Sequence, residues 1–262
     1  MLSKKQTGAQ APPRGSRETL KTAVYALLIA LFIRTFIVQA FRIPSGSMED
    51  TLLIGDFLLV DKLTYGANVP GTSWRLPGFR EPRRGDIIVF KDPQTNRDYI
   101  KRCIATGGET IEVKSNDVYI DGRSIPEPYK VLKFVGGGMP RDNYGPRTIA
   151  GKALFMMGDN RNNSQDSRYW NELDPRRVVG RAFVLYWSTD PERAPRWVRE
   201  MGEGWVKGFL QLVFGRPRLG RLGTWLAKDY TTVYAQSQPS PGPGAASAAT
   251  VEDKKDPAAD AP

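Results

Sequence analysis

A serine-rich turn follows directly on an apolar segment in a chain that contains no histidine. The turn, Phe41-Arg-Ile-Pro-Ser-Gly-Ser-Met-Glu-Asp50, could present a serine hydroxyl. A serine nucleophile needs a base that takes its proton. Without histidine the chain can build neither a Ser-His-Asp triad nor a zinc site that relies on imidazole. The base expected for a nucleophilic Ser47 is therefore a lysine.

Lys101 is the candidate for that base. In an extended strand Tyr99, Lys101 and Cys103 share one face, which puts the lysine between an aromatic and a small apolar residue. An unperturbed lysine has a pKa of about 10.4, so about one in 2,500 is neutral at pH 7. Burial can lower that pKa by about 3–5 units. The alternative is that Lys101 is an ordinary exposed lysine of a strand. Arg102 lies on the opposite face of the strand and would need its own route to water.

Ser47 also has a purely structural interpretation. Ser47-Met-Glu-Asp50 fits the capping-box pattern, so the serine could cap a short helix that begins at Met48. The two roles do not exclude each other, because a helix N-terminus points backbone N–H groups at developing negative charge.

A second polar segment, residues 158–168, is too rich in Asp, Asn, Ser and Arg for a strand. Such residues form turns held by side-chain to backbone bonds, and Asp166 and Arg168 could pair. The S-x-x-K and G-x-S-x-G signatures are absent, as are phosphate-loop and dinucleotide fingerprints. Cys103 is the only cysteine, so no intramolecular disulfide can form, and we expect it to be buried. We expect neither a metal nor a cofactor.

The N-terminal segment indicates how the serine turn is held. The net charge of +10 favours nucleic acid or an anionic membrane surface as partner. Basic residues dominate positions 1–21, and residues 22–41 are mostly apolar with Arg34 as the single charge, which can snorkel to the headgroups. We predict a cytoplasmic N-terminus at 1–20, a transmembrane anchor at 21–41 and everything later outside, with the lipid bilayer rather than nucleic acid as partner. A cleaved signal peptide is the alternative, but no small-x-small site follows the apolar run.

Short β-like runs alternate with turn signals after the span. This pattern predicts an all-β, antiparallel sandwich or barrel-like domain over 42–190. Residues 110–120 read as a hairpin that turns at 114–116. The predicted strands are 56–60, 86–90, 99–104, 110–113, 117–120, 153–157 and 178–186.

The character of the chain changes at Pro191. Trp205, Phe209, Leu212 and Val213 fall at helical spacing, and basic residues follow. The 191–235 extension is either an amphipathic helix on anionic lipid or a terminal helix packed on the sheet. Residues 236–262 are rich in Pro, Ala, Ser and Gly, which predicts a disordered tail.

Four segments together resemble the bacterial type I signal peptidase (leader peptidase) family, over roughly residues 34–188. They are Ile43-Pro-Ser-Gly-Ser-Met48 with Thr51-Leu52; Gly55-Asp-Phe-Leu-Leu-Val-Asp-Lys62 with Tyr65-Gly66; Arg84-Gly-Asp-Ile-Ile-Val-Phe-Lys91 followed by Tyr99-Ile-Lys-Arg102; and Gly158-Asp-Asn-Arg-Asn-Asn-Ser-Gln-Asp-Ser-Arg-Tyr-Trp170. Asn162 and Asn171 stand where the family usually has Asp and Gly.

The resemblance implies roles for individual residues. Ser47 is then the nucleophile, Lys101 the general base, and Ser45 a hydroxyl that forms the oxyanion hole with the Ser47 N–H. Ser164 orients the lysine amine. The supporting residues are Asp159, Asp166 and Arg168, and the substrate pockets fall at Phe41, Ile43, Leu52, Tyr99 and Ile100.

The implied function is that of a single-pass serine endopeptidase of the plasma (inner) membrane. It removes signal peptides from exported preproteins after small-x-small motifs. Two alternatives are an autoproteolytic regulator with the same dyad, which would need a DNA-binding domain, and an anchored β-domain that only binds exported proteins.

Overall fold

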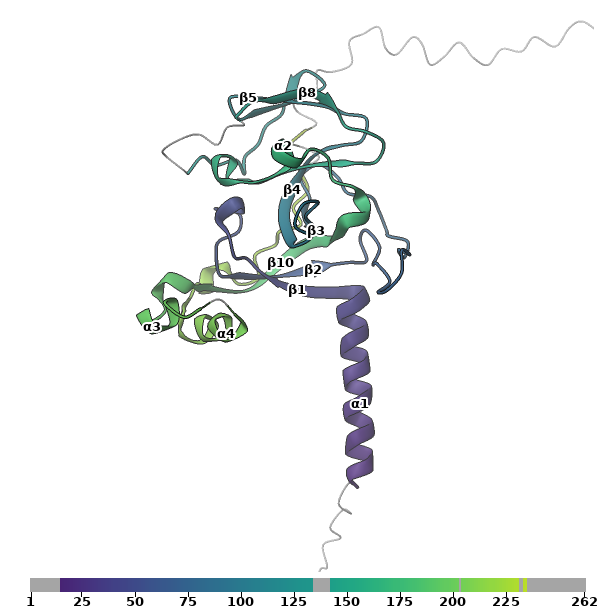
Figure 1. Cartoon of the computed structure of the whole chain (residues 1–262), viewed down its shortest axis with the longest axis vertical. Helices are drawn as coiled ribbons and strands as arrows, with labels where there is room; N and C mark the ends of the chain where they lie inside the picture. The colour runs from purple at the N-terminus through teal and green to yellow at the C-terminus, as the bar shows by residue number, and fades with distance from the viewer. Residues whose placement is uncertain (1–14, 134–141, 203, 231–232, 235–262) are drawn as a thin grey trace, which may run out of the picture. The chain divides into compact units, whose positions relative to one another are not determined.

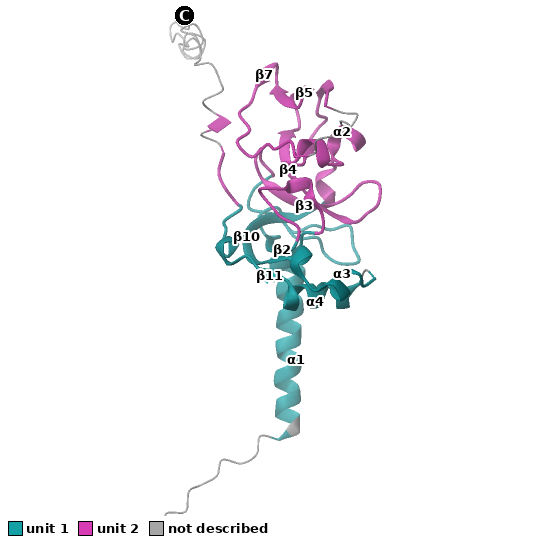
Figure 2. Cartoon of the chain, turned by 90° about the vertical axis from the view of Figure 1, so that its left-hand side faces the viewer, with its two compact units in different colours: residues 1–43, 55–81, 178–226 teal, residues 44–54, 82–177, 227–262 magenta. Residues whose placement is uncertain are grey.

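The computed structural model describes residues 15–133, 142–202, 204–230 and 233–234. Most of the predicted cytoplasmic segment and the whole predicted tail, 236–262, lie outside these ranges. The chain divides into two compact units, coloured separately in Figure 2. Unit 1 comprises residues 1–43, 55–81 and 178–226, and unit 2 comprises residues 44–54, 82–177 and 227–262. The strands of the predicted 42–190 domain are therefore distributed over both units.

Unit 1 begins with a long apolar helix, α1 (Ser16–Phe32), which continues as a π-helical turn, Ile33–Ile37 (Figure 1). The segment Arg17–Ile37 has 21 residues and a mean hydropathy of 1.8, and none of it is buried in the protein. It is therefore long and apolar enough to cross a bilayer. The Lys62 ammonium donates to the terminal carbonyls of Arg34 (3.0 Å) and Thr35 (3.1 Å). Residues 38–41, which we expected within the span, instead form a strand, because they pair along β2.

The strands of unit 1 are antiparallel, in the order β1 (Val38–Arg42), β2 (Asp56–Asp61), β10 (Val178–Asp190). A short strand, β11 (Arg216–Pro217), pairs with the end of β10. Alternate residues of β2 are buried, as a strand with one core face requires. After β10 come a 3₁₀ turn (Pro191–Arg193), α3 (Arg196–Arg199), α4 (Trp205–Phe214) and another 3₁₀ turn (Leu219–Arg221).

Unit 2 contains two groups of antiparallel strands. One has the order β3 (Ile87–Lys91), β4 (Asp98–Thr106), β9 (Leu154–Met157), and the other β7 (Arg123–Ser124), β6 (Asp117–Ile120), β5 (Thr110–Lys114), β8 (Tyr144–Thr148). Its short helical elements are Gly46–Met48, Arg161–Asn163, α2 (Ser167–Trp170) and Pro175–Arg177.

Apolar side chains of β4, β5, β6 and β9 form the core of unit 2. The buried members of this core include Ile104, Ile111, Val113, Val118, Ile120, Phe155, Met157 and, from the C-terminal segment, Tyr234. The hairpin predicted at 110–120 is confirmed, and its turn residues Ser115 and Asn116 take positive φ of 50° and 68°. The all-β, antiparallel fold class is confirmed as well, whereas β1, β7, β8 and β11 were not predicted.

Candidate active site

The serine turn of unit 2 is a 3₁₀ turn, Gly46–Met48, and Ser47 lies inside it with 7% of its surface exposed. Its N-cap position is Ser45, in extended conformation, with no capping hydrogen bond. The expectation that Ser47 caps a helix beginning at Met48 is therefore wrong. Asn160 anchors the turn, because its backbone N–H donates to Ser47 O (3.1 Å) and its side-chain amide donates to Gly46 O (3.1 Å).

Gly158 allows this close approach of the turn to the polar segment 158–168. A Cβ built on Gly158 would lie 2.5 Å from Ser47 O and 2.3 Å from Ser164 Oγ. Both distances are shorter than any carbon–oxygen van der Waals contact. Only glycine fits at this position without moving the turn.

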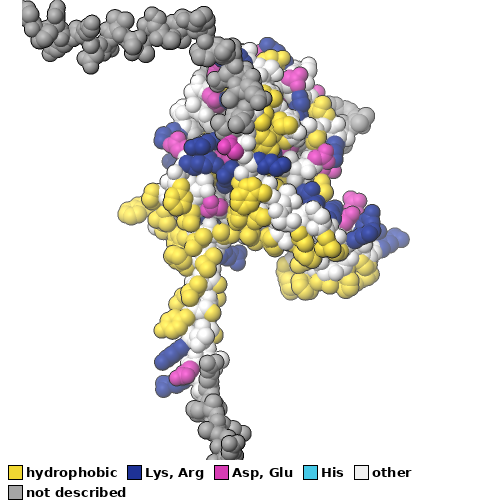
Figure 3. Space-filling view, turned by 180° about the vertical axis from the view of Figure 1, so that it is seen from behind, with side chains coloured by type: hydrophobic (Ala, Val, Ile, Leu, Met, Phe, Trp, Pro, Cys, Tyr) yellow, Lys and Arg dark blue, Asp and Glu magenta, His cyan; other side chains and the backbone are white. Residues whose placement is uncertain are grey.

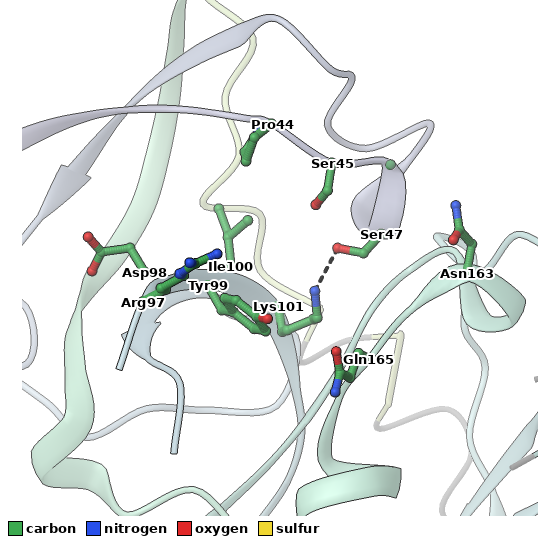
Figure 4. A pocket seen from close by; sticks show the side chains of 11 residues that line it. Pro44, Ser45, Ser47, Arg97, Asp98, Tyr99, Ile100, Lys101, Asn163 and Gln165 are labelled. Atoms are coloured by element: carbon green, nitrogen blue, oxygen red, sulfur yellow. Dashed lines mark hydrogen bonds between the residues drawn. The ribbon is translucent and has the colours of Figure 1, made fainter. Parts of the chain in front are cut away.

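Lys101 reaches Ser47 from β4. Its Nζ lies 2.6 Å from Ser47 Oγ, with the ammonium as donor (Figure 4). The lysine is 4% exposed and Cys103, two residues along the strand, is fully buried, as predicted. Once the lysine has lost its proton, the same contact lets the Ser47 hydroxyl donate to Nζ.

The pKa of Lys101 is lowered to about 8, chiefly because burial disfavours the charged amine. Three carboxylates, Asp166, Asp159 and Asp92, act against burial and favour the charged form. With a pKa near 8, about one amine in ten is neutral at pH 7, compared with about one in 2,500 for a free lysine. Burial thus makes this lysine a usable base near neutral pH.

Asp166 and Arg168 form a fully buried, bidentate ion pair, with Arg168 Nε and Nη2 each 2.9 Å from a carboxylate oxygen. Asp166 also accepts from the backbone N–H of Gly158 (3.1 Å) and of Arg168 (3.2 Å), and so caps α2. Burial by itself would raise the pKa of the Asp166 carboxyl, but the Arg168 charge and these hydrogen bonds hold it below its usual value. The pair fixes the polar segment that carries Gly158 and Asn160.

Arg102 was missed as a site residue. Only 1% of its surface is exposed, so the side chain does not reach water. Its guanidinium donates instead to the Asp159 carboxylate through Nε (2.8 Å) and Nη2 (2.6 Å). Its guanidinium lies over the rings of Tyr129 and Tyr230, at 3.9 and 5.3 Å from their centroids. Alternation along β4 placed this arginine on the face opposite Lys101, where we expected it to need a route to water; the structure instead buries it against a carboxylate.

Thr51 and Asn160 were missed too. Thr51 Oγ1 donates to the second oxygen of Asp159 (2.6 Å), so Asp159 connects the residues after the serine turn to the arginine of β4. Both residues stand in segments that carry the family resemblance, but neither was assigned a role there.

Ser164 lies in the same buried region with 1% of its surface exposed. No hydrogen bond joins its Oγ to Lys101 among the described residues, so the expected bond does not appear; the hydroxyl instead helps to lower the pKa of the Asp166 carboxyl.

A pocket of about 430 Å³ opens beside Ser47. Figure 4 shows the Ser45 and Ser47 side chains on one side of it and Ile100, Tyr99 and Lys101 on another. Its other lining residues are Pro44, Gly46, Arg97, Asp98, Asn163 and Gln165. Of the five residues expected in substrate pockets, Tyr99 and Ile100 line this one.

The other three expected pocket residues do not line it. Leu52 is fully buried within unit 2, and Phe41 and Ile43 belong to unit 1. Within the described ranges no group of acidic or cysteine side chains could hold a metal ion. Asn171, which stands where the resembled family usually has Gly, takes a φ of 67° that asparagine tolerates better than most residues.

Most of the residues described above lie in a part of the chain that is similar to known proteins. Residues 16–187 match the family described as signal peptidase, peptidase S26. A probable signal peptidase I-2 of Synechocystis is 37% identical over 185 residues, which cover 68% of this chain and 77% of the relative. The signal peptidase I of Pseudomonas aeruginosa is 35% identical over 201 residues, covering 63% and 71%.

A signal peptidase I structure from Enterococcus faecalis is 29% identical and covers 40% of this chain, with a TM-score of 0.34. The family match spans well over half of the chain and contains both Ser47 and Lys101. The chain therefore belongs to the signal peptidase family, peptidase S26.

Proposed function

We propose that this signal peptidase removes signal peptides from exported preproteins with Ser47 as nucleophile and Lys101 as general base. The observation that carries the proposal is the 2.6 Å contact between Lys101 Nζ and Ser47 Oγ. The pKa of about 8 for this lysine, lowered by burial, supports a neutral amine at that contact. No histidine competes for the role of base.

Catalysis begins when Ser47 Oγ attacks the carbonyl carbon of the scissile peptide and its proton passes to the neutral Lys101 amine. The carbonyl oxygen becomes an oxyanion, which accepts hydrogen bonds from the Ser47 N–H and the Ser45 hydroxyl. The Lys101 ammonium then gives its proton to the leaving amine nitrogen, and the C–N bond breaks. An acyl-enzyme ester on Ser47 remains, and the mature protein leaves.

The neutral Lys101 next takes a proton from water, whose oxygen attacks the ester carbonyl. Collapse of this second intermediate frees the signal peptide carboxylate and returns the proton to Ser47 Oγ. The Asp166–Arg168 and Arg102–Asp159 pairs hold the segments on both sides of the dyad and do not themselves exchange protons.

The pocket supports a preference for small side chains near the cut. Its walls beside Ser47 include Ile100, Tyr99 and Pro44, and its volume of about 430 Å³ is at the small end of ligand pockets. We propose that this pocket binds the small-x-small residues that precede the scissile bond.

We also propose that α1 spans the plasma (inner) membrane once, with the N-terminus in the cytoplasm and the catalytic residues outside. The apolar, exposed Arg17–Ile37 segment and the basic residues before it support this orientation. External protease should then digest the catalytic part in spheroplasts and leave residues 1–20 protected. Full protection of the catalytic part would contradict the orientation.

The activity is tested by incubating the purified full chain with a signal-bearing precursor and reading the cut site by mass spectrometry. Ser47→Ala and Lys101→Arg should both fall to near background, because arginine keeps the charge but cannot lose its proton. Lys114→Arg, at an exposed lysine of β5, is the matched control and should retain full activity. If Lys101→Arg kept more than about a tenth of kcat/KM, a loss below about 1.4 kcal/mol, another group would be the base.

A further inference from the structure

Helix α4 exposes several large apolar side chains, while Leu210, Gln211 and Leu212 are half-buried. Trp205, Phe209 and Val213, spaced four residues apart, are 84%, 57% and 55% exposed. On the inner side, Gln211 Oε1 accepts a hydrogen bond from the Arg42 guanidinium, and Gly208 lies close to that guanidinium. A helix that only covers a soluble domain keeps its largest apolar side chains inward, which α4 does not.

Helix α3 extends the same surface. The rings of Trp197 and Phe214 lie 5.6 Å apart in a T-shaped contact, and both remain about half exposed. We refer to the exposed side chains of the two helices as the aromatic face. It consists of Trp197, Trp205, Phe209, Val213 and Phe214. Contiguous exposed apolar surface of this kind marks an interaction site.

The aromatic face lies near the end of α1. Strand β1 starts at Val38, directly after the helical segment, and ends at Arg42. The Arg42 guanidinium donates a hydrogen bond to Gln211 of α4. Five strand residues span about 17 Å, so the backbone of Arg42 lies within that distance of the point where the chain leaves the proposed span, and α4 is one side-chain contact beyond it. Figure 3 shows hydrophobic side chains on the underside of this part of unit 1, on the side toward which α1 extends.

The charges around the face suit an anionic surface. Residues 196–218 contain five Lys or Arg and two Glu. Tryptophan is enriched at membrane interfaces, and a basic helix with aromatic side chains on its apolar face is typical of segments that lie in the plane of the bilayer. The family match ends at residue 187, so membership of the family assigns no role to α3 or α4.

We propose that the aromatic face inserts into the headgroup region of an anionic bilayer and forms a second membrane attachment beside α1. The proposal rests on the proposed anchoring by α1, because the tether brings the face to the lipid surface. A second copy of the chain is the other possible occupant. The lipid is favoured because the face lies next to the span and carries an excess of cations.

The direct test places an environment-sensitive fluorophore on the full chain in vesicles of phosphatidylglycerol and phosphatidylcholine. One variant carries it at Val213→Cys on the aromatic face, and the control at Arg123→Cys on the exposed strand β7 of unit 2. The native Cys103 is fully buried, so labelling under native conditions modifies the introduced cysteine. Brominated acyl chains should quench the probe at 213 about twofold or more and leave the probe at 123 unchanged.

Equal, weak quenching at both positions in protein that co-floats with the vesicles would overturn the proposal. A blue shift at 213 that grows with protein density, without quenching by lipid, would also overturn it, in favour of a second copy. If the whole protein failed to float with vesicles, the anchoring by α1 itself would be refuted.

A functional test uses the double variant Trp205→Glu/Phe209→Glu in proteoliposomes. We expect cleavage of a membrane-inserted precursor to fall by about three- to tenfold, because the site loses its fixed height above the bilayer. Cleavage of a short soluble peptide should be unchanged. Arg123→Glu lowers the net charge by the same two units on strand β7 of unit 2 and should retain full cleavage of both substrates. Equal cleavage of the inserted precursor by the double variant and the wild type would contradict the proposal.

Discussion

Substitution of Gly158 by alanine tests how closely the serine turn must approach the polar segment. The added Cβ would lie 2.5 Å from Ser47 O, whereas a carbon–oxygen contact needs about 3.3 Å. The carbonyl of Ser47 must therefore move by about 0.8 Å, and the 2.6 Å contact with Lys101 must change with it. The Ser164 hydroxyl, the other close group, belongs to a side chain that can rotate, so the backbone clash decides the outcome.

The expected loss follows from that displacement. A misplacement of about 1 Å costs up to about a hundredfold in rate. We expect kcat to fall by about 30- to 100-fold, which corresponds to about 2–3 kcal/mol of transition-state stabilisation. Overpacking should also lower the free energy of unfolding by about 1–3 kcal/mol.

The assay measures kcat and KM separately on a soluble peptide with a small-x-small sequence, alongside urea unfolding. Gly220→Ala is the matched control, because a Cβ there meets no atom within 4 Å, and both its activity and its stability should equal those of the wild type. A folded Gly158→Ala protein with kcat within about threefold of the wild type would refute the reasoning, since the nucleophile would then tolerate the displacement.

Three further experiments test the surroundings of the dyad. The value of kcat/KM should rise about tenfold between pH 7 and pH 9 and level off above the Lys101 pKa of about 8, since the neutral amine is the active form; a flat profile would exclude a lysine base. Ser164→Ala should lower kcat by about ten- to a hundredfold, about 1–3 kcal/mol, because we propose that its hydroxyl turns to orient the neutral Lys101 amine during the reaction; an unchanged kcat would assign it a structural role alone. Asp159→Asn leaves the buried Arg102 poorly paired and should cost about 3–5 kcal/mol of folding free energy, measured by urea unfolding. Since the Asp159 charge raises the pKa of Lys101, the midpoint of the pH profile should also move to lower pH in this variant, and a shift to higher pH would contradict the electrostatic assignment.

The sequence named the two residues of the proposed dyad, because composition narrowed the choice of base and the family resemblance assigned the roles. The lack of histidine excluded the usual base, and the serine turn and the Tyr-Ile-Lys-Arg strand supplied the candidates. Period-two alternation predicted the strands around Lys101 and the hairpin of β5 and β6, because each strand buries one face and its pattern depends on near neighbours. The strands β1, β7, β8 and β11 were missed since they have exposed or weakly patterned residues and form only through their pairing partners.

The tertiary structure decided what surrounds the dyad. Arg102 is buried by Asp159 and Tyr129, which are distant in the sequence, so its fate depended on which segments pack against β4. Gly158 and Asn160 gain their roles from an approach to the serine turn that spans more than a hundred residues.

The same distinction applies to α4 and to the lysine. Helical spacing predicted the helix, but only the contact of Gln211 with Arg42 fixed which face turns outward. The sequence names Lys101, yet its pKa of about 8 follows from the summed burial and charge that the whole fold imposes on one amine. The local sequence pattern indicates which residues are candidates and which elements carry them. The desolvation that lowers the pKa of the amine is set by everything that packs around it.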